Sequence, residues 1–208
     1  MRRIAESTVR RLSLYLRFLE AFEHQGVTTV SSEALAAQGG GGTTPAQVRK
    51  DLSFFGSFGK RGLGYDVRVL ATRIRDILGL KRRYRVALVG AGRVGGALVQ
   101  YEGFRDRGFE IVAIYDRDPK KIGARWNGLV VRDAAHLEAD LKRNPVDIAI
   151  VVTPAAAAQD VVDRLVKGGV KGILNFAPTA ISVPATVVLK TVNMAQELET
   201  LSFALARK

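Results

Sequence analysis

The stretch Arg85-Val-Ala-Leu-Val-Gly-Ala-Gly-Arg-Val-Gly-Gly96 decides the fold of the larger part of the chain. Its apolar run, Val86 to Val89, predicts a buried strand, and the glycines that follow allow a tight turn into a helix. At such a turn the bare backbone lets a pyrophosphate approach the helix N-terminus, where unpaired N–H groups favour an anion. The glycine pattern alone is weak evidence for a binding site.

An acid at the expected spacing strengthens this interpretation. Ile111-Val-Ala-Ile-Tyr-Asp116 predicts a second strand that ends in a carboxylate. This carboxylate can accept hydrogen bonds from an adenosine ribose, so we predict a dinucleotide site. Two alternatives stay open: a glycine-lined turn that binds nothing, and a site for another adenine nucleotide such as coenzyme A. Asp116 argues against the second alternative.

The composition limits the classes of protein that the chain can belong to. Its length of 208 residues allows one large domain or two small ones, and a hydrophobic fraction of 47% is enough for a core. The absence of cysteine excludes disulfides, a thiolate nucleophile and a cysteine-based metal site, and we expect no metal. We find no signal peptide and no run of about 18 apolar residues, so we expect a cytoplasmic location and no membrane partner.

The positive charge of the chain is concentrated in its first part. The net charge is +12, and residues 1–83 hold 15 basic and 7 acidic residues. A concentrated positive field favours a polyanionic partner. A solvated basic surface without such a partner is the alternative that charge alone leaves open.

Residues 1 to about 80 predict a mostly helical domain. A first helix is followed by a turn at His24-Gln-Gly26, a short helix capped by Ser31, and the run Gly39–Gly42. We interpret this glycine run as a mobile surface turn. A further helix begins at Thr44-Pro45, where threonine suits the N-cap and proline the first helical position, and ends near Gly56. The apolar face of the first helix consists of Val9, Leu12, Tyr15, Leu16 and Leu19.

The order of these helices is typical of a helix-turn-helix DNA-binding unit. Phe58 to Val67 then predicts a β-hairpin wing with a basic tip, and Thr72 to Leu78 another helix before a linker at 79–83. Double-stranded DNA is the partner that this arrangement favours. The predicted contacts are Gln47 and Arg49 at base edges, Lys50, Arg10 and Arg11 at phosphates, and Lys60 and Arg61 in the minor groove.

Residues 84 to about 177 alternate between apolar strands and helices, which predicts an α/β domain with a parallel sheet. We expect a final amphipathic helix from Asn193 to Ala206. The expected strands are 85–89, 110–115, 128–131, 147–152 and 172–176, with a possible addition at 184–192, and the expected helices are 93–101, 134–143 and 155–167.

Several of these stretches resemble the Rex family of redox-sensing transcriptional repressors. The stretch Ala46-Gln-Val-Arg-Lys-Asp-Leu-Ser-Phe-Phe-Gly-Ser-Phe-Gly-Lys-Arg-Gly-Leu-Gly-Tyr65 is the most specific part of the likeness. The glycine pattern, Tyr101-Glu-Gly-Phe104, Gly172-Ile-Leu-Asn-Phe-Ala-Pro178 and the closing helix resemble the family too. The resemblance covers nearly the whole chain in the expected order.

The resemblance implies a redox-sensing repressor that binds operator DNA as a homodimer and is released by NADH. It implies a winged-helix DNA-binding domain at 1–80, a Rossmann-like NAD(H)-binding domain at 84–192 and a domain-swapped helix at 193–208. The cofactor-binding residues that it implies are Gly90, Gly92, Arg93, Val94 and Gly95 at the pyrophosphate, Asp116 at the ribose, Lys121 near the adenine, Thr153, Pro154, Asn175, Phe176 and Ala177 around the nicotinamide, and Tyr101, which reports on that pocket.

One position departs from the family pattern. The residue before the closing helix is often Asp in relatives, where it can join a redox-dependent network with Tyr101 and with the arginine that is Arg17 here. This chain has Asn193, a neutral amide that cannot form the same ion pair but can bond to Tyr101. Asn193 also suits a helix N-cap, with Gln196 three residues later. We hypothesise that NADH still releases the protein from DNA, with a weaker electrostatic coupling between position 193 and Arg17 than in relatives that have Asp.

The main alternative is an NAD-dependent oxidoreductase with a basic helical domain. Such an enzyme needs a proton donor or acceptor near the nicotinamide, and the two histidines, His24 and His136, lie outside the expected site. We therefore expect a regulator without catalytic residues. An apolar pocket favours the neutral ring of NADH over the charged ring of NAD⁺. Asp116 disfavours NADP(H) by repelling the 2′-phosphate, although Arg117 and Lys120 weaken this repulsion.

Overall fold

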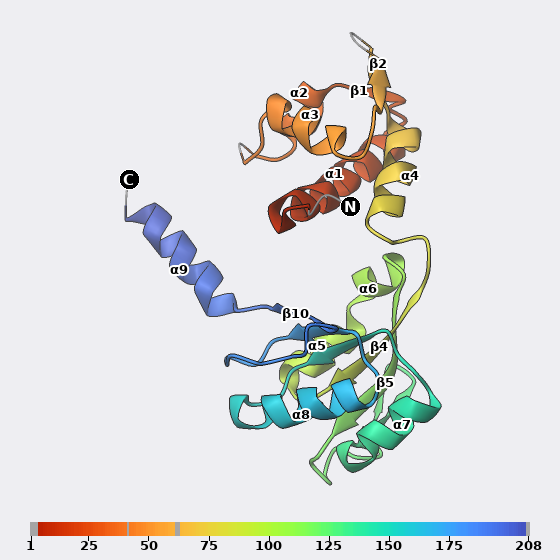
Figure 1. Cartoon of the computed structure of the whole chain (residues 1–208), viewed down its shortest axis with the longest axis vertical. Helices are drawn as coiled ribbons and strands as arrows, with labels where there is room; N and C mark the ends of the chain where they lie inside the picture. Colours follow the sequence, from red (N-terminus) through yellow and green to blue (C-terminus); the bar gives the residue numbers. More distant parts are fainter. Residues whose placement is uncertain (1–3, 41, 61–62, 207–208) are drawn as a thin grey trace. The chain divides into compact units, whose positions relative to one another are not determined.

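The computed structural model describes residues 4–40, 42–60 and 63–206. Their contacts divide the chain into two compact units, Met1–Arg82 and Arg83–Lys208 (Figure 1). The division falls in the predicted linker at 79–83. Each unit has a hydrophobic core of its own.

The first unit is a helical bundle with a small sheet. The core packs α1 (Glu6–His24) against α2 (Ser32–Ala37), α3 (Pro45–Ser53) and α4 (Val67–Ile77). The buried side chains of this core include Leu16, Leu35, Leu52 and Ile74. Val9 was wrongly placed on the buried face of α1, because 40% of it is exposed. The elements are α1 (Glu6–His24), β1 (Thr29–Val30), α2 (Ser32–Ala37), α3 (Pro45–Ser53), β2 (Gly59–Lys60), β3 (Gly64–Asp66) and α4 (Val67–Ile77).

The predicted helix caps are confirmed. The Ser31 hydroxyl accepts a hydrogen bond from the Ala34 N–H at 3.1 Å, and the Thr44 hydroxyl accepts one from the Gln47 N–H at 3.1 Å. Pro45 takes the first position of α3. Because each cap satisfies an N–H that the first helical turn leaves unpaired, the start of α3 is fixed by its own sequence.

The hairpin is also confirmed, with two differences. β3 pairs antiparallel with β2, as expected, and also with β1, a strand that was not predicted from the sequence. α4 begins at Val67, five residues before the predicted start at Thr72. Asp66 caps it by accepting a hydrogen bond from the Val69 N–H at 2.9 Å, and a side-chain cap of this kind starts the helix directly after the strand.

The second unit contains a seven-stranded sheet in the order β10-β9-β8-β4-β5-β7-β6. All neighbouring pairs are parallel except β6 with β7. The elements are β4 (Tyr84–Val89), α5 (Arg93–Gln100), α6 (Glu102–Asp106), β5 (Phe109–Asp116), β6 (Arg125–Trp126), β7 (Leu129–Asp133), η1 (Ala134–His136), α7 (Leu137–Arg143), β8 (Ile148–Val151), α8 (Ala155–Lys167), β9 (Gly172–Asn175), β10 (Val188–Thr191) and α9 (Met194–Leu205).

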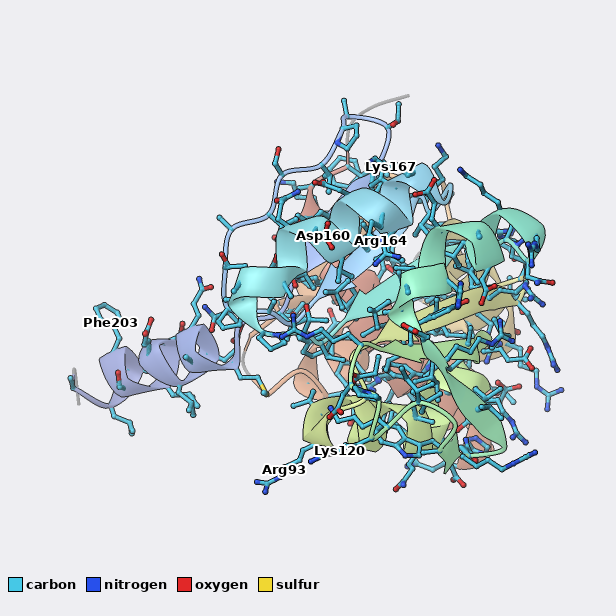
Figure 2. The ribbon with its side chains drawn as sticks, turned by 90° about the horizontal axis from the view of Figure 1, so that it is seen from below. Arg93, Lys120, Asp160, Arg164, Lys167 and Phe203 are labelled. Atoms are coloured by element: carbon cyan, nitrogen blue, oxygen red, sulfur yellow. The ribbon has the colours of Figure 1, made fainter. Side chains whose placement is uncertain are left out.

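Successive residues of β4 pack on opposite faces of this sheet. Leu88 joins the core that α5 covers, whereas Ala87 and Val89 join the core that α7 and α8 cover. Figure 2 shows Arg164 on α8, and this side chain donates to the Ala134 and Ala135 carbonyls at 2.5 and 3.0 Å. The sheet grows from β4 in two directions, because β5 pairs with one side of β4 and β8 with the other. In open α/β sheets, ligands bind beyond the carboxyl ends of the strands at such a reversal point.

The last helix, α9, keeps its apolar side chains exposed. Met194, Leu198, Leu201, Phe203 and Leu205 are each more than half exposed in the single chain. Figure 2 shows Phe203 pointing away from the α9 ribbon. Within the described residues, no helix combines the length and the apolar character needed to cross a membrane.

Candidate nucleotide-binding cleft and nucleic-acid interface

The glycine loop between β4 and α5 depends on backbone that a side chain would block. Gly90 has φ +113°, in the left-handed region, and a Cβ there would lie 2.6 Å from the Val152 carbonyl oxygen. A Cβ at Gly95 would collide with the Gly90 carbonyl oxygen. Gly92 is the N-cap of α5, and space around it is open to at least 4 Å. The loop can therefore receive a ligand close to its backbone.

Asp116, at the end of β5, holds this loop in place. Its Oδ2 accepts hydrogen bonds from the Ala91 N–H at 2.6 Å and from Lys121 Nζ at 3.3 Å, and its Oδ1 accepts one from the Asp118 N–H at 2.8 Å. A carboxylate can accept about four hydrogen bonds, so one acceptor position remains, on Oδ1. This is the atom that can meet a ribose hydroxyl.

Asp116 is ionised at neutral pH. Burial alone would raise its pKa, but hydrogen bonds from Asp118, Ala91 and Lys121 outweigh burial and hold the pKa below the ordinary carboxyl value. The ribose contact is a prediction from the sequence, whereas the second role of Asp116, which is to anchor the backbone of the glycine loop, appears only in the structure.

A cleft of about 920 Å³ runs along the carboxyl ends of the central strands. A volume of this size suits a ligand as large as a dinucleotide. Eight of the predicted cofactor residues line it, namely Gly90, Gly92, Val94, Asp116, Lys121, Thr153, Pro154 and Phe176. Other residues of its wall were not predicted from the sequence, and they include Pro119, Ala134, Val152, Ala157, Val161, Pro178 and Val192.

Thr153 brings an unpaired polar group to this wall. Its Oγ1 is buried and has no hydrogen-bond partner among the described residues. A buried hydroxyl without a partner costs about 1–3 kcal/mol. A ligand that offers a polar atom at this point of the cleft would remove that cost.

The remaining predicted cofactor residues lie elsewhere. Gly95 lies beneath the loop, and Arg93 lines a neighbouring hollow with Trp126 and points outward in Figure 2. Tyr101 is 53% exposed and lines a separate cavity of about 540 Å³, where its ring meets Phe104 edge-on at 5.1 Å. Within this chain, Tyr101 is therefore not part of the cleft.

Asn175 and Ala177 lie behind the wall of the cleft rather than on it. Asn175 is fully buried, and its Nδ2 donates to the Ala177 carbonyl at 3.0 Å while its Oδ1 accepts from the Ala177 N–H at 2.9 Å. Both ends of the amide thus serve the loop that presents Phe176 to the cleft. Their predicted place around the nicotinamide stays a prediction, and their hydrogen bonds show that they also shape this loop.

Asn193 lines the cleft and caps α9. Its Oδ1 accepts hydrogen bonds from the Ala195 N–H at 3.1 Å and the Gln196 N–H at 3.3 Å, which confirms the capping role. The other two predicted switch residues lie apart in the chain, Tyr101 in its own cavity and Arg17 in the first unit. The start of α9 is therefore one wall of the cleft.

The first unit presents a basic helix beside a groove. A groove of about 560 Å³ lies between α2, α3 and the wing, and Arg49 lines it. Arg49 donates to Ser32 Oγ and Glu33 Oε1, both at 3.2 Å, yet its side chain stays 54% exposed. Lys50 is exposed, and Arg10, paired with Glu6, is 74% exposed. Lys60 ends β2, and the predicted contact Arg61 lies outside the described residues.

Arg11 forms an ion pair inside the first unit. It donates to the buried Asp51, from Nε to Oδ2 at 2.6 Å and from Nη2 to Oδ1 at 2.8 Å. Gln47 also bonds to Asp51, from Nε2 to Oδ1 at 2.8 Å. The contact of Arg11 with a phosphate stays a prediction. Nothing local in the sequence shows that a buried carboxylate 40 residues away is its partner within the chain.

Asp51 is held in its charged form by these partners. Burial alone would raise its pKa, but hydrogen bonds from Arg11, Gln47 and Tyr15 outweigh burial and keep the pKa below the ordinary value. In turn, burial and the hydrogen bond to Asp51 raise the pKa of Tyr15. The charge therefore stabilises the fold of the first unit at neutral pH.

The stability that Asp51 provides is expected to disappear in acid. A carboxyl with a lower pKa in the folded chain stabilises the fold above its unfolded pKa of about 4, and this stabilisation is lost as the pH falls through the folded pKa. The difference in urea midpoint between wild type and Asp51→Asn should therefore be largest at neutral pH and shrink below about pH 4. Circular dichroism of the helical signal measures it. A constant difference would contradict the charged network.

Two family models match the chain. A model described as "CoA binding domain" matches residues 81–179, and one described as "Putative DNA-binding protein N-terminus" matches residues 3–53. The first covers the glycine loop and most of the cleft, and the second covers α1, α2 and α3.

Relatives match along nearly the whole chain. A protein of Carboxydothermus hydrogenoformans named "Redox-sensing transcriptional repressor Rex" is 49% identical over 205 residues, which are 99% of this chain and 98% of the relative. A protein of the same name from Streptomyces coelicolor is 46% identical over 207 residues, which are 100% of this chain and 80% of the relative.

Solved structures match both units together. The structure "RSP in complex with beta-NAD+ and operator DNA" has a TM-score of 0.93 and 36% identity, and covers 100% of this chain and 94% of that chain. The structure of RSP "in complex with beta-NADH" has a TM-score of 0.88 and 35% identity, and covers 98% of this chain and 95% of that chain.

Proposed function

Because the chain belongs to the Rex family of redox-sensing transcriptional repressors, we propose that it represses transcription by binding operator DNA and is released when NADH binds. One observation carries the proposal: a single chain joins a winged helix-turn-helix with a cleft at the reversal point of a parallel sheet. The first feature suits DNA and the second a dinucleotide. The proposed domains are 1–80, 84–192 and 193–208.

NAD(H) is the dinucleotide that we propose. Two solved structures that cover nearly the whole chain hold NAD⁺ and NADH. The family model that matches residues 81–179 carries the name of coenzyme A instead. The ionised Asp116, with one free acceptor position, favours a ribose whose hydroxyls are free, whereas the ribose of coenzyme A carries a 3′-phosphate that this charge would repel.

The same charge supports a preference for NADH over NADPH. The 2′-phosphate of NADPH would approach Asp116, although Arg117 and Lys121 in the cleft reduce the repulsion. At the other end of the cleft, Val152, Pro154 and Phe176 offer apolar contacts. Burying the charged ring of NAD⁺ there costs desolvation that the neutral ring of NADH avoids.

We propose that the protein is a regulator and not an enzyme, and that it forms a homodimer. The charged residues that line the cleft, Asp116, Arg117, Asp118 and Lys121, belong to its ribose end. The exposed apolar side chains of α9 favour packing against a second copy. In that homodimer, Arg17, Tyr101 and Asn193 form the proposed switch.

Release of DNA by NADH is the direct test. Fluorescence anisotropy of a labelled pseudo-palindromic operator candidate, taken from upstream of the gene, is followed while NAD⁺, NADH and NADPH are added separately. We expect NADH alone to release the protein at low concentration, because only a ligand with different affinities for the two states shifts the equilibrium. Turnover of NADH with a carbonyl substrate would favour the oxidoreductase instead.

A further inference from the structure

Asp51 occupies an unusual position on α3, the helix whose Gln47 and Arg49 are predicted to contact base edges. It is fully buried, and it faces α1, from which Thr8, Arg11 and Tyr15 reach it. Arg11 binds both of its oxygens, and the Tyr15 hydroxyl donates to Oδ2 at 2.9 Å. A side chain that is fully buried in this way does not contact DNA itself.

A fourth partner comes from α3 itself. Gln47 lies one helical turn before Asp51, and its Nε2 donates to Asp51 Oδ1 at 2.8 Å. An ionised carboxylate only accepts hydrogen bonds, so the amide of Gln47 must turn its nitrogen toward Asp51. Its Oε1 and the second hydrogen on Nε2 then remain for other partners.

These two remaining groups match the edge of an adenine. In the major groove adenine offers a donor at N6 and an acceptor at N7, and a glutamine reads both with its carbonyl and one amide hydrogen. A glutamine that is free to flip its amide presents the pair in either order. One that is tied to a carboxylate presents the pair in a single order.

We propose that Asp51 is a specificity-determining positioning residue, which fixes the amide of Gln47 in the orientation that reads an A·T base pair. The inference rests on the proposed DNA binding and names one part of it. It differs from a purely structural role for Asp51, because it concerns one base pair and not the affinity for DNA as a whole.

The test compares discrimination at single base pairs. Each position of the operator is replaced in turn, and the affinity ratio between the original and the changed operator is measured for wild type, Gln47→Ala and Asp51→Asn. We expect Gln47→Ala to lose discrimination at one A·T position, by about tenfold. Asp51→Asn should lose it at the same position only, because an asparagine at this site can also donate and lets the Gln47 amide flip.

A control variant separates positioning from stability. Tyr15→Phe removes a hydrogen bond to Oδ2 and leaves the bond between Gln47 and Oδ1 in place. It should keep the discrimination of wild type even where it lowers the melting temperature. If Asp51→Asn does not fold, the double variant Arg11→Gln/Asp51→Asn, which leaves no unpaired charge, replaces it.

Two results would overturn the inference alone: wild-type discrimination in Asp51→Asn, or an equal loss of affinity at every position and for non-specific DNA. A wild-type protein that discriminates at no position would instead overturn the proposed function. Loss of discrimination at the Gln47 position in Asp51→Asn, and its retention in Tyr15→Phe, would support the inference.

Discussion

Gly95→Val is expected to abolish the response to NADH while operator binding persists. A Cβ at this position collides with the Gly90 carbonyl oxygen, which is backbone within the glycine loop and cannot move aside without opening the turn. Strain of about 3 kcal/mol in the loop would weaken NADH binding about 100-fold. Calorimetric titration with NADH measures the loss, and operator anisotropy shows that the first unit still binds DNA.

The neighbouring glycine provides a matched control. A Cβ at Gly96 would make ordinary contact with the Trp126 ring, at 3.5 Å. Gly96→Ala should therefore bind NADH as the wild type does, although it adds a methyl group to the same helix. Normal NADH affinity in Gly95→Val would show that the ligand does not approach this loop.

Asp116→Asn is expected to reverse much of the preference for NADH over NADPH. The substitution removes the charge that opposes a 2′-phosphate, and an amide cannot accept from Ala91, Asp118, Lys121 and a ribose together. Hydrogen bonds to a charged group contribute about 1.5–3 kcal/mol each, so NADH affinity should fall about 10- to 100-fold. NADPH affinity should fall less or rise.

Asp133 offers the control for this substitution. It ends the adjacent strand β7, as Asp116 ends β5, but its Oδ1 accepts from the Ala135 N–H at 2.7 Å and caps η1. Asp133→Asn should leave the ratio of NADH to NADPH affinity unchanged. An unchanged ratio in Asp116→Asn as well would mean that Asp116 only supports the loop.

Features that depend on neighbouring residues could be predicted from the sequence. The glycine loop follows from Gly90 and Gly95, and the start of α3 follows from Thr44 and Pro45, because the groups that interact lie within a few residues of each other. The parallel sheet follows in the same way from the alternation of apolar strands with helices.

Features that depend on distant partners could not be predicted. Arg11 and Asp51 are 40 residues apart, so the sequence shows only a surface-like cation and a surface-like acid. Asn175 ends a strand at the edge where ligands bind. The sequence does not show that both the nitrogen and the oxygen of the Asn175 side-chain amide are bonded to the backbone of Ala177. In both cases a polar side chain forms hydrogen bonds with a buried polar group. The direction in which the side chain points depends on the packed fold.

The exposed face of α9 has a consequence for how the protein would work at low abundance. Five large apolar side chains stay exposed on the single chain, and the proposed homodimer would cover them. Association makes the fraction of competent protein depend on total concentration. We therefore expect the NADH concentration that relieves repression to depend on the number of copies of the protein in the cell. Scarce protein should leave the operator at a lower NADH concentration than abundant protein.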